Sequence, residues 1–166
     1  MLPVASLCFL MALGAVGCLG YRLGSTLPLG IRSVYVPIFV NDCKEPQVET
    51  VATSATIQEF QRDGTLQIAA ADVADSILEV TLIDFELEPL RYDPDQVKKT
   101  SEYRLRLTAH IIFTRRDADE VLLEREVQGE STFVPSGDLS SSKRSALPEA
   151  TRDLAHDIVE SVVEFW

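Results

Sequence analysis

Two neighbouring segments, 102–114 and 120–134, alternate apolar and polar residues along most of their length. Side chains of a β-strand point to opposite faces in turn, so this alternation predicts two strands joined as a hairpin. A simple register then pairs Arg106 with Glu130, Thr108 with Gln128, and His110 with Glu126 on a polar face. The apolar face holds Leu105, Leu107, Ala109, Ile111, Phe113, Val121, Leu123 and Val127.

A third strand is predicted over residues 77–87, where the alternation changes phase. The apolar residues are Leu78, Val80 and Leu82 at even positions, then Ile83, Phe85 and Leu87 at odd positions. One extra residue in a strand produces such a slip, so we expect a β-bulge near residues 82–84. The polar residues 89–100 are expected to form a connection.

Residues 31–40 are rich in β-branched and aromatic side chains and predict a fourth strand. Pro37 has no N–H group to give to a ladder, so we expect this strand at a sheet edge or broken near its end. Residues 66–70 predict a fifth, short strand.

Apolar residues at helical spacing predict two helices. The first covers residues 47–62 and ends at Asp63-Gly64, with Val48, Val51, Ala52, Ala55, Glu59 and Phe60 near one face. The second covers residues 147–166 and follows a serine-rich loop at 136–143, with Pro148 in its first turn. Its apolar stripe is Leu147, Ala150, Leu154, Ile158 and Val162.

These elements predict one α+β domain over residues 31–166. Both helices should cover the apolar face of the sheet, because that face must be buried against another layer. The expected architecture is a two-layer sandwich. It places two helices on one face of a small mixed, mostly antiparallel sheet of about four to five strands.

The first 17 residues carry no charged side chain and end in small residues directly before Cys18. The segment Ala15-Val16-Gly17-Cys18 resembles the lipobox of bacterial lipoproteins. This resemblance implies removal of residues 1–17, N-acyl and S-diacylglycerol groups (palmitate among the chains) on Cys18, and a lipidated tether over 18–30. An uncleaved anchor from Leu2 to Leu19 and plain secretion are the alternatives.

The net charge of −11 argues against nucleic acid as a partner, because nucleic-acid-binding domains present a basic surface. Residues 91–116 differ from the rest of the acidic chain, because they carry seven basic and only three acidic side chains. A local basic patch on an acidic protein can attract anions, and the candidate residues are Arg91, Lys98, Lys99, Arg104 and Arg106. The alternative is that Arg104 and Arg106 pair across strands with Glu130 and its neighbours.

The sequence contains no nucleophile elbow, phosphate-binding loop or dinucleotide-binding motif. We therefore expect neither an enzyme nor a metal or other cofactor. Once Cys8 is removed and Cys18 acylated, Cys43 has no partner within the chain. We interpret it as a thiol without a role, the alternatives being an intermolecular disulfide or a reactive thiol.

Several different short motifs follow one another along the mature chain. They are Cys18-Leu19-Gly20-Tyr21-Arg22-Leu23, Leu27-Pro28, Ile31 to Asn41, Glu45-Pro46, Glu59 to Gly64, Ala74 to Val80, Glu102 to Leu105, Leu154-Ala155 and Ile158-Val159. In this order they resemble the LptE family of lipopolysaccharide-assembly lipoproteins, over nearly the whole mature chain. The resemblance implies two helices on a small mixed sheet, which agrees with the element order above.

The resemblance also implies a function. Members are non-enzymatic outer-membrane lipoproteins, anchored by lipid on the periplasmic side. They plug and help to assemble the β-barrel LptD, and they assist lipopolysaccharide insertion into the outer leaflet. The implied partners are LptD, lipopolysaccharide and the outer membrane. The alternative is an envelope lipoprotein that activates a peptidoglycan synthase or assembles a secretion pore.

Overall fold

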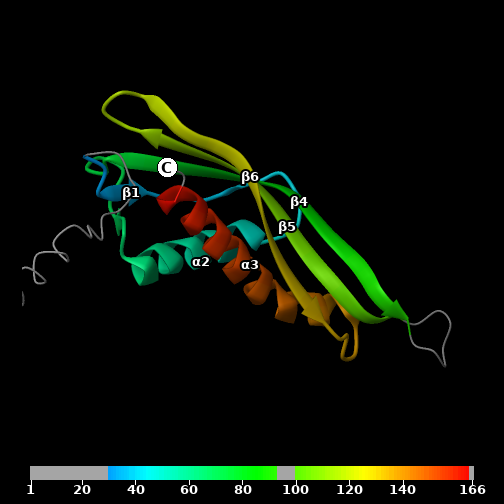
Figure 1. The fold of residues 1–166 in the computed structure, drawn as a ribbon. Coiled ribbons are helices and arrows are strands. Elements are labelled where there is room, and N and C mark those ends of the chain that lie inside the picture. The colour runs from blue at the N-terminus through cyan, green and yellow to red at the C-terminus, as the bar shows by residue number, and fades with distance from the viewer. Residues whose placement is uncertain (1–29, 93–99, 165–166) are drawn as a thin grey trace, which may run out of the picture.

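A six-stranded mixed sheet covered on one face by two helices forms the fold in the computed structural model, which describes residues 30–92 and 100–164 (Figure 1). The strands are β1 (Ser33–Tyr35), β2 (Val40–Asn41), β3 (Gln67–Ile68), β4 (Ser76–Tyr92), β5 (Thr100–Arg115) and β6 (Glu120–Phe133). The helices are α2 (Val48–Asp63) and α3 (Leu139–Val163). The predicted α+β sandwich is confirmed.

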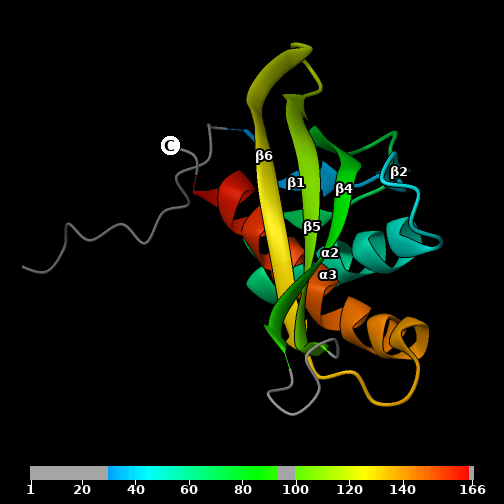
Figure 2. The same cartoon turned by 90° about the vertical axis from the view of Figure 1, so that its right-hand side faces the viewer.

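The sheet runs in the order β3-β1-β4-β5-β6, with β2 paired to β4 beyond β1. The long strands β4, β5 and β6 are antiparallel, whereas β1 and β2 lie parallel to β4. Figure 2 shows α2 and α3 behind this sheet. The three long strands therefore form the frame, and the short parallel strands extend it on one side.

The register predicted from alternation is confirmed in the hairpin of β5 and β6 as far as Phe113, and in this part Arg106 faces Glu130 and His110 faces Glu126. The pairing shifts between Phe113 and Thr114, so the prediction was wrong for Val121, which is exposed rather than on the apolar face. The predicted bulge is also present, because the pairing of β4 with β5 shifts between Leu82 and Asp84. The extra residue keeps Leu82 and, beyond the bulge, Leu87 on the helix-covered side.

Pro37 divides the predicted strand 31–40 into β1 and β2, which raises the number of strands to six. The break was expected, because proline cannot donate to the ladder. An edge position was the other expectation, and it does not hold for β1, which lies between β3 and β4. The prediction of a connection from residue 89 was wrong at its start, because β4 continues to Tyr92 with register shifts after Pro89.

Helix α2 has nearly its predicted bounds, and Gly64 ends it in the left-handed conformation with φ 77°. Its buried face is turned slightly from the predicted one, because Thr53 and Thr56 are buried while Val51 and Ala55 are half-buried. The Thr53 hydroxyl explains part of this difference. It accepts a hydrogen bond from the Phe39 N–H (3.0 Å) and donates one to the Glu49 carbonyl (2.6 Å).

Helix α3 begins at Leu139, within the segment predicted as a serine-rich loop, and that prediction was wrong. Asp138 caps the helix by accepting a hydrogen bond from the Ser141 N–H at 2.9 Å. Ser142, which is buried, donates to the Asp138 carbonyl at 3.0 Å. Pro148 consequently lies inside the helix rather than in its first turn, with its side chain exposed.

The core lies between the sheet and the helices, and its largest fully buried side chains include Phe60, Phe113, Leu107, Leu154 and Ile158. Helix α3 packs on β5 and β6, and α2 packs beside α3. Gly129 of β6 lies directly against the backbone of Leu154, where a Cβ atom would overlap the helix. Within the described ranges, no helix combines the length and apolarity needed to cross a membrane.

Candidate functional site

The sheet face opposite the helices, which we call the outer face, brings together charged side chains from three strands. Glu86 and Glu88 come from β4, Arg104 and Arg106 from β5, and Glu130 from β6. They meet because the bulge in β4 sets Glu86 opposite Arg106 and Glu88 opposite Arg104. Two of the predicted anion-binding residues are therefore neighbours on this face.

Arg106 is held by carboxylates from both adjacent strands. Its Nε donates to Glu130 Oε1 at 2.7 Å, and its Nη1 donates to Glu86 Oε2 at 3.2 Å. The hydrogen bond with Glu130 is the main cause that raises the pKa of Arg106 above the already high value of a guanidinium. Such bonds between strands orient the guanidinium along the sheet.

Arg104 lies two residues before Arg106 on β5, and it also contacts glutamates of both neighbouring strands. Its Nε is 3.3 Å from Glu130 Oε2, and its Nη1 is 3.8 Å from Glu88 Oε2. Glu130 therefore lies between the two arginines. Arg91, near the end of β4, is 3.3 Å from Glu102 Oε2, but its side chain is 78% exposed.

The carboxylates on this part of the outer face outnumber the guanidinium groups, since Glu86, Glu88 and Glu130 surround Arg104 and Arg106. An anion that approaches these arginines therefore meets the negative charge of the glutamates beside them. Of the other predicted site residues, Lys98, Lys99 and the lipidation residue Cys18 lie outside the described residues.

The histidines also pair with glutamates. His110 Nε2 is 3.1 Å from Glu124 on the outer face, and His156 Nδ1 is 3.4 Å from Glu59, between the helices. Arg62 contacts the same Glu59 carboxylate. The described part of the chain contains no group of three or more side chains suited to hold a metal ion.

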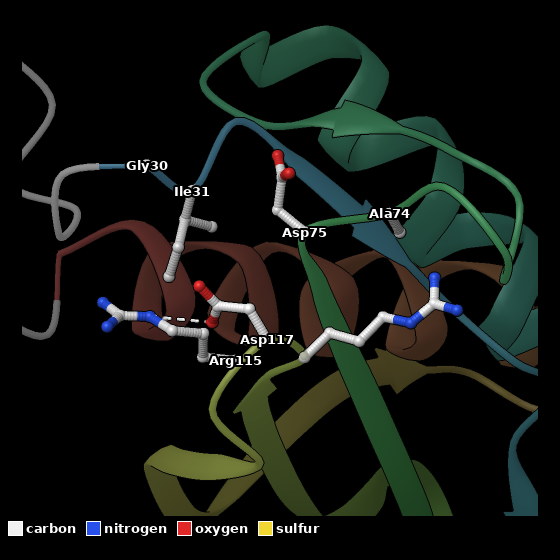
Figure 3. A pocket seen from close by; sticks show the side chains of 7 residues that line it. Gly30, Ile31, Ala74, Asp75, Arg115 and Asp117 are labelled. Atoms are coloured by element: carbon white, nitrogen blue, oxygen red, sulfur yellow. Dashed lines mark ion pairs between the residues drawn. The ribbon is translucent and has the colours of Figure 1, made fainter.

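A pocket of about 410 Å³ opens at the end of the sheet beside Gly30 and Ile31, and no pattern in the sequence predicts it (Figure 3). Its lining residues are Gly30, Ile31, Ala74, Asp75, Arg115, Arg116 and Asp117. Asp75 accepts hydrogen bonds from the Ser33 hydroxyl (2.8 Å) and the Arg32 N–H (3.0 Å), which lower the pKa of its carboxyl. Arg115 faces Asp117 at 3.9 Å. The two bonds of Asp75 join the start of β1 to the residue just before β4.

A larger pocket of about 650 Å³ lies between the N-terminal parts of α2 and α3. Phe85 of β4 is half-buried here, and the Lys143 ammonium stands 5.2 Å from the centre of its ring. Lys143 also pairs with Glu45 at 2.7 Å. The lining also includes Arg144, so one positive charge remains after Lys143 has paired with Glu45.

Comparison with protein families decides the relationship suggested by the motifs. The model of the LptE family, described as lipopolysaccharide-assembly, matches residues 31–162. The chain belongs to the LptE family. These are outer-membrane lipoproteins with no known cofactor. No curated protein is significantly similar to the chain in sequence.

Solved structures share the fold at low sequence identity. A protein from Xanthomonas campestris superposes with a TM-score of 0.58 at 12% identity, covering 84% of this chain and 88% of that one. Uncharacterized lipoprotein B of Nitrosomonas europaea gives 0.55 at 12% identity, over 86% and 92% of the two chains. A minor lipoprotein of Acinetobacter baumannii gives 0.52 at 11% identity, over 80% and 92%. At such identities the likeness extends to the fold alone.

Proposed function

We propose that this LptE-family chain is the lipoprotein subunit that plugs and helps to assemble the lipopolysaccharide-transport barrel LptD. In this role it assists insertion of lipopolysaccharide into the outer leaflet. The family match over residues 31–162 is the observation that carries the proposal. The proposed role is one of binding rather than catalysis.

The proposed anchor is acylated Cys18. A single acyl chain binds membranes only marginally, whereas several chains together anchor stably. Residues 19–30 would then connect the lipid to the domain. An extended chain covers about 3.3–3.6 Å per residue, so this tether keeps the domain within roughly 40 Å of the membrane surface.

Arg91, Lys98, Lys99, Arg104 and Arg106 are the proposed contacts for lipopolysaccharide phosphates. Arg104 and Arg106 suit this task, because a guanidinium can bind a phosphate through two parallel hydrogen bonds. Glu130 lies between them and opposes an incoming anion. The glutamates keep the arginines oriented in the absence of ligand, and a phosphate would have to replace at least one of them.

The competition between glutamate and phosphate gives a two-sided test in a lipopolysaccharide pull-down. Arg104→Ala with Arg106→Ala should weaken binding, whereas Glu130→Gln should strengthen it because it removes the competing charge. Arg152→Ala is the matched control, because Arg152 is an exposed arginine on α3 that pairs with Glu149. Unchanged lipopolysaccharide binding after replacement of Arg104, Arg106, Lys98 and Lys99 together would reject this site.

A further inference from the structure

Strand β6 forms one edge of the sheet, and among the described residues it pairs with β5 alone. In an antiparallel strand, alternate residues direct their N–H and C=O groups toward the partner and away from it. The Glu130 N–H points away from β5, because it donates to Asp153 Oδ2 of α3 at 2.8 Å. By the same alternation, Glu124, Glu126 and Gln128 direct their backbone groups outward.

Helix α3 covers only one part of this edge. Asp153 takes the Glu130 N–H, Ser131 donates its hydroxyl to the Ala146 carbonyl at 3.1 Å, and Gly129 touches Leu154. From Gln128 back to Glu124 the edge is open. No described side chain or backbone group outside the hairpin hydrogen-bonds to the outward N–H groups there.

The open part of the edge adjoins an acidic pocket of about 440 Å³ between β6 and the C-terminal half of α3. The charged residues of its lining are Arg125, Glu126, Asp157, Glu160 and Glu164. Burial, together with the charges of Asp153 and Glu160, raises the pKa of Asp157. Negative charge in this pocket is therefore not fully compensated by Arg125.

We propose that the β6 edge from Glu124 to Gln128 binds an extended basic segment of a partner protein, which adds to the sheet as a further strand. An open edge offers backbone hydrogen bonds to such a segment, and side chains beside the edge select it. The acidic residues on both sides of the edge specify lysine or arginine in the partner. This proposal does not depend on the lipopolysaccharide site.

A second copy of the chain does not fit as the occupant. Two β6 edges paired with each other would bring Glu124 and Glu126 of one copy beside the same residues of the other. Like charges on directly facing positions destabilise a strand pair. The edge thus resists self-association and remains suited to a segment of opposite charge.

The added strand would lie about 4.8 Å from β6, with its side chains alternating between the two faces of the sheet. Side chains on the helix side would reach Asp157 and Glu160, whereas those on the outer face would lie beside Glu124 and Glu126. Basic residues at every second position therefore suffice, whichever face they occupy. Three residues of β6 supply the backbone donors and acceptors.

The test uses an acetylated ten-residue peptide of alternating lysine and valine together with the mature chain, residues 18–166. Binding should slow amide exchange at Glu124, Glu126 and Gln128 in NMR, and a peptide of alternating glutamate and valine should not bind. Glu126→Pro removes one outward N–H without removing a bond to β5, and it should weaken binding at least tenfold. The control Glu126→Gln keeps the N–H and should weaken binding only a few-fold.

A second comparison leaves the protein unchanged. The same lysine–valine peptide with an N-methyl group on every backbone amide keeps its charge but has no N–H group on either edge to pair as a strand, so it should bind at least tenfold more weakly. Equal binding of the methylated and unmethylated peptides would overturn strand addition in favour of simple charge attraction. Absence of binding by the unmethylated peptide would overturn the proposal as a whole.

Discussion

Replacement of Gly129 by alanine tests how the helix layer is seated on the sheet. A Cβ atom at this position would lie 2.5 Å from the Cα of Leu154, and closer still to its backbone nitrogen. Carbon atoms pack at about 3.5–4.0 Å, so α3 would have to move by about 1 Å. The obstacle is backbone, which cannot rotate aside as a flexible side chain can.

The expected cost follows from two contributions. Overpacking of a close contact costs about 1–3 kcal/mol, and more when the backbone must shift. The same shift strains the hydrogen bond from the Glu130 N–H to Asp153. We therefore expect Gly129→Ala to lower the free energy of unfolding by about 3 kcal/mol, which corresponds to a fall in Tm of about 6–12 °C.

Urea denaturation measures this change directly, with Gln128→Ala as the control on the same strand. Gln128 is exposed, so its replacement should change stability by less than about 0.5 kcal/mol. Adding Leu154→Ala to Gly129→Ala should not restore stability, because the clash includes the backbone of residue 154. A Gly129→Ala protein as stable as the Gln128→Ala control would refute the proposed close approach.

Three further predictions concern carboxylates. Asp75→Ala should lower Tm at neutral pH, because the hydrogen bonds to Ser33 and Arg32 are lost. The lowered pKa of the Asp75 carboxyl determines the pH range over which these bonds stabilise the fold. The stabilisation is present above the unfolded pKa of about 4 and disappears as pH falls through the lower folded pKa, so the two melting curves should converge in acid. Asp157→Asn should raise Tm at neutral pH, because the raised pKa of Asp157 shows that the fold disfavours its negative charge. A higher Tm of the variant that persists below about pH 4, where this carboxyl is protonated in both states, would contradict this reason. Asp138→Ala should speed amide exchange at Ser141, whose N–H loses its acceptor, while exchange in α2 stays unchanged.

Alternation in the sequence predicts the long strands well, because one face of β5 is fully buried and a shift of one residue would expose it. The bulge in β4 was visible for the same reason: Leu82 and Phe85 cannot share a face without an extra residue. The α+β sandwich followed from these strands and from the apolar stripes of two helices.

The start of α3 was not predictable from apolar spacing. Its first turns carry serines, whose side chains compete with the backbone for hydrogen bonds and favour loops and caps. Here Ser142 instead bonds back to Asp138 and is buried, which depends on tertiary packing. Pro148 added to the error, because proline usually marks a first turn rather than a helix interior.

The candidate site was predicted in part. The sequence pairs Arg106 with Glu130, and this pairing is confirmed. Glu86 and Glu88 complete the cluster, but their contacts with the arginines depend on how the bulge sets the register of β4 against β5. Alternation alone does not show which residue of β4 is the extra one at the bulge. The glutamates that face Arg104 and Arg106 are therefore known only from the structure.

Co-purification tests the central claim most directly. The full chain, tagged at its C-terminus, would be isolated from detergent-solubilised envelopes, and stable partners would be identified by mass spectrometry, with Cys18→Ser as the control for lipid anchoring. We expect a large outer-membrane β-barrel of the LptD type in near-equal amount with the chain. Recovery of a penicillin-binding protein or a secretion pore in its place would contradict it.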